Sequence, residues 1–148
     1  MGANLDNTID KAITIDRATA APTSAAIFTI AGGRVKAEFI GEVTTVIQTQ
    51  DDNVKLVSTP TVGVAVDLCA VNNITADAVG TMYTITGNFA DALQATTSGA
   101  IPVASLQSRG IILAAGTVDL NCSAVNTGSI KWTCIYEPID AGAYVVPA

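Results

Sequence analysis

Apolar and polar residues alternate along several short stretches of the chain, most clearly near the C-terminus. Residues 116–122 and 129–137 both follow this pattern, and Asn126, Thr127 and Gly128 between them are typical turn residues. A period of two is typical of strands with one buried face. The pattern therefore predicts an antiparallel hairpin. The residues expected on its buried faces are Val118, Leu120, Cys122, Ile130, Trp132, Cys134 and Tyr136.

Strand-like segments rich in Val, Ile and Thr recur at short intervals from residue 27 onward. They cover residues 27–30, 35–40, 42–49, 54–58, 62–69, 81–86 and 111–113. Turn residues separate several of them, as at Gly32, Gly33 and 51–53. Many short strands at this spacing predict an all-β fold, a single jelly-roll-like β-sandwich.

Three of these segments carry more specific expectations. Residues 62–69 place four apolar side chains on one face of a strand: Val62, Val64, Val66 and Leu68. Asn88 is a suitable cap for one helical turn over residues 89–94, the only helix expected inside the domain. Residues 95–110 contain Gly, Ser and Pro, and we expect them to form a connection.

Residues 1–25 differ from the rest, because they are rich in Ala and Thr and contain no aromatic residue. A short helical stripe fits four of them: Leu5, Ile9, Ala12 and Ile13. Ile13 and Ile15 also fit an alternating strand, and the pattern does not decide between the two. We expect either an extended N-terminal arm that lies on a neighbouring chain or a frayed tail. The sandwich domain is expected over residues 26–148.

The composition predicts a surface with few charges. Apolar residues make up 49% of the 148-residue chain and charged residues only 14%, against roughly 25% in typical soluble domains. Such a surface must present Thr, Ser, Asn and Ala to water, and it is easily desolvated against other subunits. We therefore favour burial against partner chains over a neutral domain that works alone.

Charge and hydropathy disfavour two classes of partner. The net charge is −6, and the seven basic residues are scattered, so neither nucleic acid nor an anionic membrane surface is an expected partner. No apolar run reaches the roughly 18 residues of a membrane-spanning helix. The N-terminal residues do not resemble a signal peptide, so we expect synthesis in a cytoplasm.

Two basic and two acidic residues lie close together in the sequence. Arg34 and Lys36 are followed by Glu38 and Glu42, which we expect to lie on a strand edge. We expect the two glutamates to be solvated or to pair with Arg34 and Lys36 of another subunit.

Residue types needed for catalysis or metal binding are mostly missing. The chain has no His, the commonest general base and metal ligand. Its cysteines lack C-x-x-C spacing and are expected to be buried thiols, with a Cys122–Cys134 bridge as the less favoured alternative. Asp51 and Asp52 lie in an expected turn, where carboxylates form local hydrogen bonds. We expect a protein that is not an enzyme and binds no cofactor or metal.

The aromatic residues are expected in the core rather than in a binding site. Trp132 and Tyr136 are in phase with the apolar residues of their strand. The same expectation holds for Phe28, Phe39, Tyr83 and Phe89.

Five segments of the chain resemble a known class of viral protein. They read IFTIAGGRV at residues 27–35, IGEVT at 40–44, GTVDL at 116–120, KWT at 131–133 and YEP at 136–138. The chain is similar there to small structural proteins encoded in tailed-phage head gene clusters, of the capsid decoration or cement kind. The resemblance extends over roughly residues 27–144 in pattern and composition and includes no catalytic motif.

The resemblance implies a jelly-roll-like domain on the outside of the virion capsid. Such proteins commonly form homotrimers over junctions between subunits of the major capsid protein, which would be the partner. Symmetric repetition of modest contacts then suffices to stabilise the shell. The candidate partner-binding residues, taken from the arm and from the charged strand, are Leu5, Ile9, Ile13, Ile15, Arg34, Lys36, Glu38 and Glu42.

Two other functions are weighed against this one. A phage tail or fibre module that binds a host receptor is the alternative, which aromatic residues in an exposed loop would favour; residues 95–110 contain none. A lyase or hydrolase is disfavoured because the chain lacks His and paired carboxylates.

Overall fold

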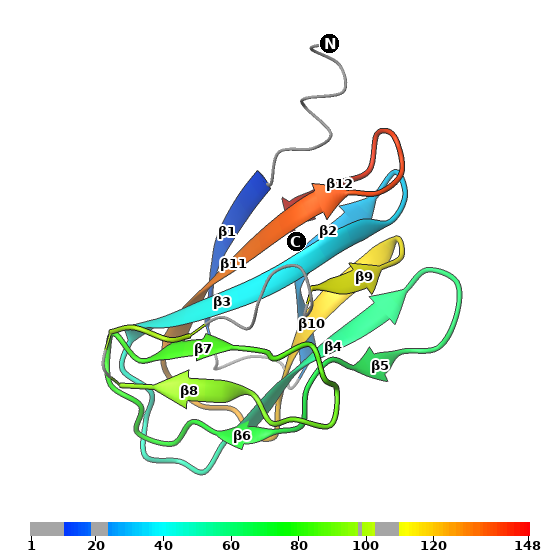
Figure 1. Cartoon of the computed structure of the whole chain (residues 1–148). Coiled ribbons are helices and arrows are strands. Elements are labelled where there is room, and N and C mark those ends of the chain that lie inside the picture. Colours follow the sequence, from blue (N-terminus) through cyan, green and yellow to red (C-terminus); the bar gives the residue numbers. More distant parts are fainter. Residues whose placement is uncertain (1–10, 19–23, 98, 103–109) are drawn as a thin grey trace.

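Two antiparallel β-sheets pack face to face in the computed structural model, which describes residues 11–18, 24–97, 99–102 and 110–148 (Figure 1). Sheet A contains, in spatial order, β1 (Lys11–Ala18), β11 (Ser129–Pro138), β3 (Val35–Thr45), β7 (Met82–Thr84) and β8 (Gln94–Thr96), with β9 (Ile111–Leu113) also paired to β3. Sheet B contains β12 (Tyr144–Pro147), β2 (Ser24–Ala31), β10 (Gly116–Cys122), β4 (Asn53–Pro60) and β5 (Val66–Asp67), with β6 (Asn72–Asn73) also paired to β4.

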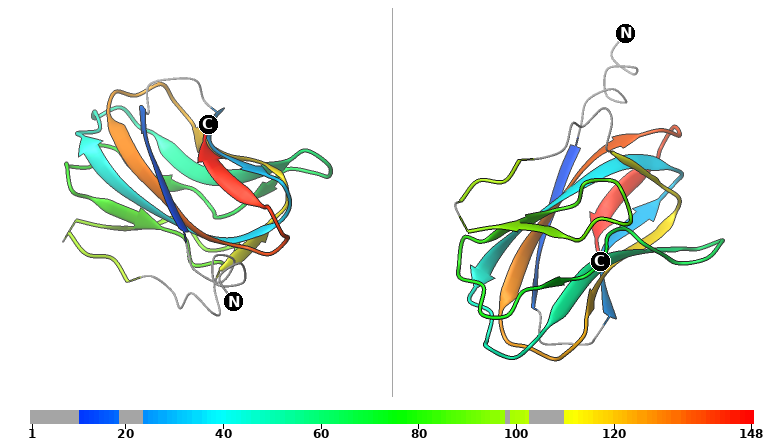
Figure 2. Two further views of the ribbon diagram at one scale, coloured as in Figure 1. Left: turned by 90° about the horizontal axis from the view of Figure 1, so that it is seen from above. Right: turned by 60° about the horizontal axis from the view of Figure 1, so that its bottom comes forward.

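Successive long strands alternate between the two sheets (Figure 2). β1 and β3 belong to sheet A, whereas β2 and β4 belong to sheet B. The chain then returns, so that β10 lies between β2 and β4 and β11 lies between β1 and β3. This strand order is that of a jelly roll. The prediction of an all-β, jelly-roll-like sandwich is confirmed.

The core lies between the sheets and is built from alternate residues of the long strands. Trp132 is fully buried and stacks on Tyr83, with ring centroids 6.2 Å apart. Phe28 of sheet B meets Phe39 of sheet A at 5.9 Å between centroids. The Phe28–Phe39 contact joins the two sheets, whereas Trp132 and Tyr83 both belong to sheet A. All four residues are buried, so their predicted core position is confirmed.

The predicted hairpin of residues 116–122 and 129–137 is wrong in its pairing. Its two strands, β10 and β11, are real, and their alternation is as predicted, but they lie in opposite sheets. Each faces the core from its own layer. Alternation reports only which face of a strand is buried, and it does not tell whether the next strand pairs beside it or packs across from it.

The predicted strand over residues 62–69 is also wrong. β4 ends at Pro60 and the chain turns through an exposed loop before the two-residue β5. Val62 and Val64 are 87% and 88% exposed, and among the four alternating residues only Leu68 is buried. Gly63 adopts a φ of 122°, which a β-strand does not accommodate and a turn does.

The helical turn predicted after Asn88 is replaced by a tight turn. The Asn88 carbonyl accepts a hydrogen bond from the Asp91 N–H, and its side-chain Oδ1 accepts one from the Ala90 N–H. The chain then continues to Leu93, whose N–H donates to the Ala70 carbonyl and does not form a second helical hydrogen bond. Phe89 at the tip of this turn is 43% exposed, and its predicted core position is wrong.

Part of the segment expected as an N-terminal arm is a strand of the sandwich. Lys11–Ala18 forms β1, which pairs with β11 along its whole length, from Lys11 opposite Tyr136 to Ala18 opposite Ser129. The proposed domain boundary at residue 25 therefore falls inside the fold. The remainder of the expected arm, residues 1–10, lies outside the described residues.

Candidate interaction surface

The outer face of sheet A carries most of the charges found on the strands. Lys131 of β11 and Glu42 of β3 are direct cross-strand neighbours, with 3.3 Å between Lys131 Nζ and Glu42 Oε2. Glu137 and Lys36 are also opposite each other on these strands. The charges on this face thus lie in complementary positions within one chain.

Two of the charged candidates, Arg34 just before β3 and Glu42 on β3, are engaged within the chain, contrary to expectation. Arg34 pairs with Asp140 and Glu42 with Lys131, so neither pairs as proposed. Glu38 is 7% exposed and is not the solvated residue expected at a strand edge. The partners of Arg34 and Glu42 lie far along the chain, and neighbouring positions in the sequence do not reveal them.

The apolar candidates from the expected arm also serve this chain's own fold. Ile13 and Ile15 lie opposite Cys134 and Trp132 on the inward face of β1, and they pack against the core. Their proposed role as anchors on another chain is therefore corrected. Leu5 and Ile9 lie outside the described residues.

The outer face of sheet B has a different character. One row of directly paired residues runs across it from Val146 through Thr29 and Thr117 to Thr59. Next to this row, Tyr144 lies opposite Ala31. We call this surface the threonine face and define it by these six residues: Thr29, Ala31, Thr59, Thr117, Tyr144 and Val146. None of them is charged, and Tyr144 and Val146 are 48% and 39% exposed.

The charges nearest the threonine face are neutralised or hydrogen-bonded by neighbours. Asp119 accepts hydrogen bonds from the hydroxyls of Thr59 at 2.7 Å and Thr117 at 2.8 Å. Lys55 and Asp67 form a salt bridge of 2.7 Å where β4 pairs with β5. The threonine face itself presents hydroxyl and apolar groups, which are cheaper to desolvate than charges, and Asp119 is the carboxylate that adjoins it.

A protruding apolar turn adjoins the same sheet. Residues 61–65, here called the valine loop, connect β4 to β5 and extend beyond the rest of the sandwich (Figure 1). All five are exposed and none is charged. Val62 and Val64 are the most exposed large apolar residues described. An isolated exposed valine is ordinary, but two at the tip of one projecting turn mark a contact surface.

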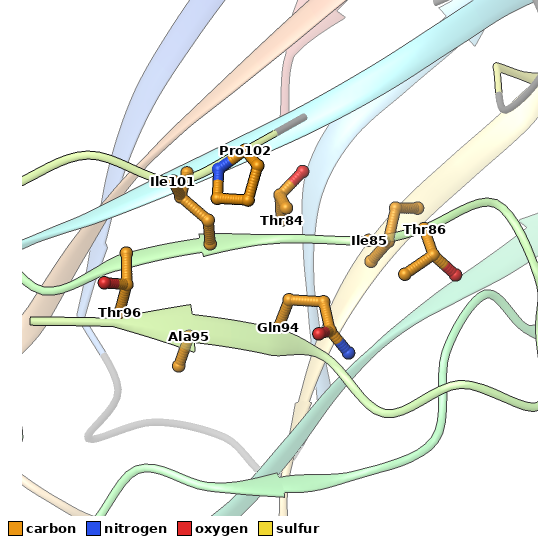
Figure 3. A pocket seen from close by; sticks show the side chains of 8 residues that line it. All are labelled: Thr84, Ile85, Thr86, Gln94, Ala95, Thr96, Ile101 and Pro102. Carbon is orange, nitrogen blue, oxygen red and sulfur yellow. The ribbon is translucent and has the colours of Figure 1, made fainter. Parts of the chain in front are cut away.

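A shallow apolar pocket lies on the β7–β8 hairpin. Ile101 and Pro102 pass over β7 beside Thr84, and Gln94 of β8 closes the hollow below (Figure 3). Its volume is about 370 Å³, at the small end of the range for ligand pockets. The described lining residues include no charged group and no nucleophile other than threonine hydroxyls: Thr84, Ile85, Thr86, Gln94, Ala95, Thr96, Ile101 and Pro102.

The thiols and the buried carboxyl group are not arranged for catalysis. Cys69, Cys122 and Cys134 are free and buried, as predicted. Burial raises the pKa of Cys122 and that of Cys134 to about 12, so both are protonated at neutral pH. Within the described residues no three His, Cys, Asp or Glu side chains gather as a metal site would require. None of the described segments is a helix able to cross a membrane.

Asp52 is a buried carboxyl group whose pKa is raised. It is fully buried where the chain enters β4, and its Oδ1 accepts a hydrogen bond from the Ala124 N–H at 3.3 Å. Desolvation raises its pKa, and the hydrogen bonds from Ala124 and Ser123 oppose that shift. The neighbouring Asp51 bonds instead to Asn73 at the surface, so the two aspartates do not act as a pair. The prediction of local hydrogen bonds within a turn is wrong, because Asp52 bonds to a residue 72 positions away and Asp51 to one 22 positions away.

The threonine face and the valine loop were missed by the sequence analysis. The sequence did contain a sign of the threonine face, because Thr29, Thr59 and Thr117 each occupy an outward strand position next to a buried residue. Their convergence depends on sheet B register, which brings residues almost 90 positions apart into one row. For the valine loop, alternation alone suggested burial.

Comparison with known proteins adds little to this picture. No protein-family model matches the chain, and no curated protein matches its sequence. A chain in the structure of infectious bursal disease virus, Gx strain, is similar at 11% identity and a TM-score of 0.29. The match covers 93% of this chain, which spans 42% of that chain. A similarity of this size carries no argument about function.

Proposed function

We propose that the protein is a virion structural protein that decorates the outside of a tailed-phage head and binds the major capsid protein through the threonine face. The phage assignment comes from the sequence resemblance over residues 27–144. The surface assignment comes from the structure, because the two outer faces differ. Charged residues lie opposite each other on the strands of sheet A, whereas the row from Val146 to Thr59 on sheet B presents hydroxyls and apolar side chains, with the charged residues of that sheet (Lys55, Asp67 and Asp119) beside it. This difference is the observation that carries the proposal.

The threonine face suits attachment to a large, repetitive protein surface. Its residues are short or rigid, so little side-chain entropy is lost on burial. Tyr144 supplies an aromatic anchor of the kind enriched in interfaces, and Val146 lies two residues further along the same strand. The antiparallel pairing of sheet B places these side chains in rows, so the surface is preorganised before it binds.

A structural rather than enzymatic role is part of the proposal. The described residues supply buried thiols and a buried aspartate, but no cleft that combines a nucleophile with a base. The shell partner, the position on the capsid exterior and an assembly of three copies belong to the same proposal. Their basis is the resemblance.

Binding to purified heads that lack this protein tests the proposal. Thr29→Lys places an ammonium in the centre of the threonine face, and burial of that charge should weaken head binding at least about tenfold. Thr133→Lys is the matched control, because Thr133 is half-buried in the middle of β11 on the outer face of sheet A. Loss of binding with Thr133→Lys but not with Thr29→Lys would place the contact on sheet A and contradict the proposed surface. Failure of the unaltered protein to bind any head would reject the proposed partner.

A further inference from the structure

The valine loop is held in its exposed position by the strands at its base. β4 and β5 pair through Val57 with Asp67 and Ser58 with Val66, and the Thr61 N–H bonds to the Ala115 carbonyl at 2.9 Å. Directly after β5, Leu68 is buried in the core and fixes the return of the chain. The projection of the loop is therefore a property of the fold, and its two valines cannot turn inward.

The β7–β8 pocket has properties that complement this loop. It is concave, it has a volume of about 370 Å³, and its described lining is uncharged. The loop is convex, and its exposed large side chains are two valines. A chain with a net charge of −6 repels its own copies, so contact between copies is favoured where neither surface carries charge.

The loop and the pocket also lie on well-separated parts of the molecule. The turn between β4 and β5 extends from one side, whereas β7 and β8 lie toward the other in all views (Figures 1 and 2). A loop therefore cannot enter the pocket of its own chain. Since every copy carries both the valine loop and the β7–β8 pocket, a head-to-tail contact between them can repeat from copy to copy.

We infer that copies of this chain associate head to tail, with the valine loop of one copy inserted into the β7–β8 pocket of the next. Val62 and Val64 enter the hollow framed by Ile101, Pro102 and Gln94. The contact is heterologous, so a suitable rotation between copies closes a ring. It uses surfaces other than the threonine face and stands whether or not the partner is a phage head.

A second copy fits the valine loop better than a lipid surface does. Loops that insert into bilayers usually combine apolar residues with Trp, Tyr, Lys or Arg at the interface. Residues 61–65 contain none of these, and the acidic chain is repelled by anionic lipid. An uncharged protein pocket requires neither interfacial Trp, Tyr, Lys or Arg residues nor an attractive net charge.

Engineered disulfides test the contact directly. Val62→Cys chains are mixed with Gln94→Cys chains under mild oxidation, and we expect cross-linked dimers in the mixture that neither variant forms alone. The native thiols are buried and give no background. Val125→Cys replaces Val62→Cys as the control, because Val125 is 58% exposed and belongs to neither the valine loop nor the described pocket lining. Cross-linking no better than this control, or equally strong in Val62→Cys alone, would overturn the inference.

Light scattering gives an independent readout without cysteines. The unaltered chain should show a mass well above 15.0 kDa at high micromolar concentration. The Val62→Ser/Val64→Ser variant should weaken association about 100-fold or more, at about tenfold for each valine removed from a buried contact. Val79→Ser/Val125→Ser, which alters two other exposed valines, should associate normally. An unaltered chain that stays monomeric, or one whose valine loop instead drives flotation with phosphatidylcholine vesicles, would overturn the inference.

Discussion

Arg34 and Asp140 join the two turns at one end of the sandwich through three hydrogen bonds. The Arg34 N–H and Nε donate to Asp140 Oδ2 at 2.8 and 2.9 Å, and the second guanidinium nitrogen reaches Oδ1 at 2.8 Å. One turn leads from β2 to β3 and the other from β11 to β12. A Cβ on Gly33 would lie 2.6 Å from the Asp140 Cβ, so only glycine leaves room for this approach.

We expect Asp140→Asn to lower the melting temperature at neutral pH, with an effect that becomes smaller as the pH falls below about 4. Hydrogen bonds from the Arg34 side chain and backbone hold the pKa of Asp140 well below its ordinary value of 3.8. A carboxyl group with a lowered folded pKa stabilises the fold above its unfolded pKa and loses that contribution as the pH falls. Thermal unfolding of both proteins from about pH 6 to about pH 2 measures this. A difference that stays constant over the whole range would contradict it.

Asp52→Asn should have the opposite effect and raise the melting temperature at neutral pH. Burial raises the pKa of Asp52, so the folded state binds its proton more tightly than the unfolded state does. Its stabilising contribution is complete below the unfolded pKa of about 3.8 and is lost as the pH rises through the folded pKa. Asparagine keeps the oxygen that accepts from Ala124 and removes the buried charge.

The control for Asp52 is its neighbour. Asp51→Asn changes the same charge at an exposed position and should shift the melting temperature much less. Equal shifts from the two substitutions would show that the chain responds to net charge, and the buried setting of Asp52 would not be the cause.

Gly41 and Trp132 should be energetically coupled. A Cβ on Gly41 would lie 2.9 Å from Trp132 Cζ3, so Gly41→Ala should destabilise the fold by about 1–3 kcal/mol through overpacking. Trp132→Ala removes the largest buried side chain and should cost about 3–5 kcal/mol. In a double-mutant cycle with Trp132→Phe, the alanine at 41 should cost less than in the unaltered chain. If the free-energy changes of the two substitutions, measured by urea unfolding, were additive, the close contact between Gly41 and Trp132 would be contradicted.

β1 should contribute to the stability of the domain. Ile15 lies opposite Trp132 on the inward face of β1 and packs against the core, so Ile15→Ala should cost about 1–3 kcal/mol. Thr14→Ala, on the outward face of the same strand, is the control. Unfolding free energies from urea titration compare the two. If Ile15→Ala did not lower the free energy of unfolding, residues 11–18 would be an arm that contributes nothing to the stability of the domain.

Short-range pattern was sufficient for the fold class and for much of the core. The alternation around Trp132 predicts its burial, because one inward residue in two is a local property of a strand. Pairing was not predictable from it, as β10 and β11 illustrate. Val62 and Val64 show a second limit, since a projecting turn and a buried strand can share the same alternation. Phe89 shows a third, because the turn after Asn88 decides its exposure.

The candidate surface depended on information that the sequence does not display locally. Arg34 was predicted to pair with another subunit, yet its partner Asp140 lies 106 residues away in the same chain. The row from Thr59 through Thr117 to Thr29 exists only because β10 lies between β4 and β2. Low charge predicted that some surface would be buried, but the register of sheet B determines which one.

Cryo-electron microscopy of the intact head tests the central claim most directly. We expect one domain for each binding position on the shell exterior, oriented so that Thr29, Thr117 and Tyr144 face the major capsid protein. Side-chain density for Tyr144 should enter a contact with the shell. A domain that meets the shell through Lys131 and Glu137 on sheet A, with the threonine face exposed to solvent, would contradict the claim.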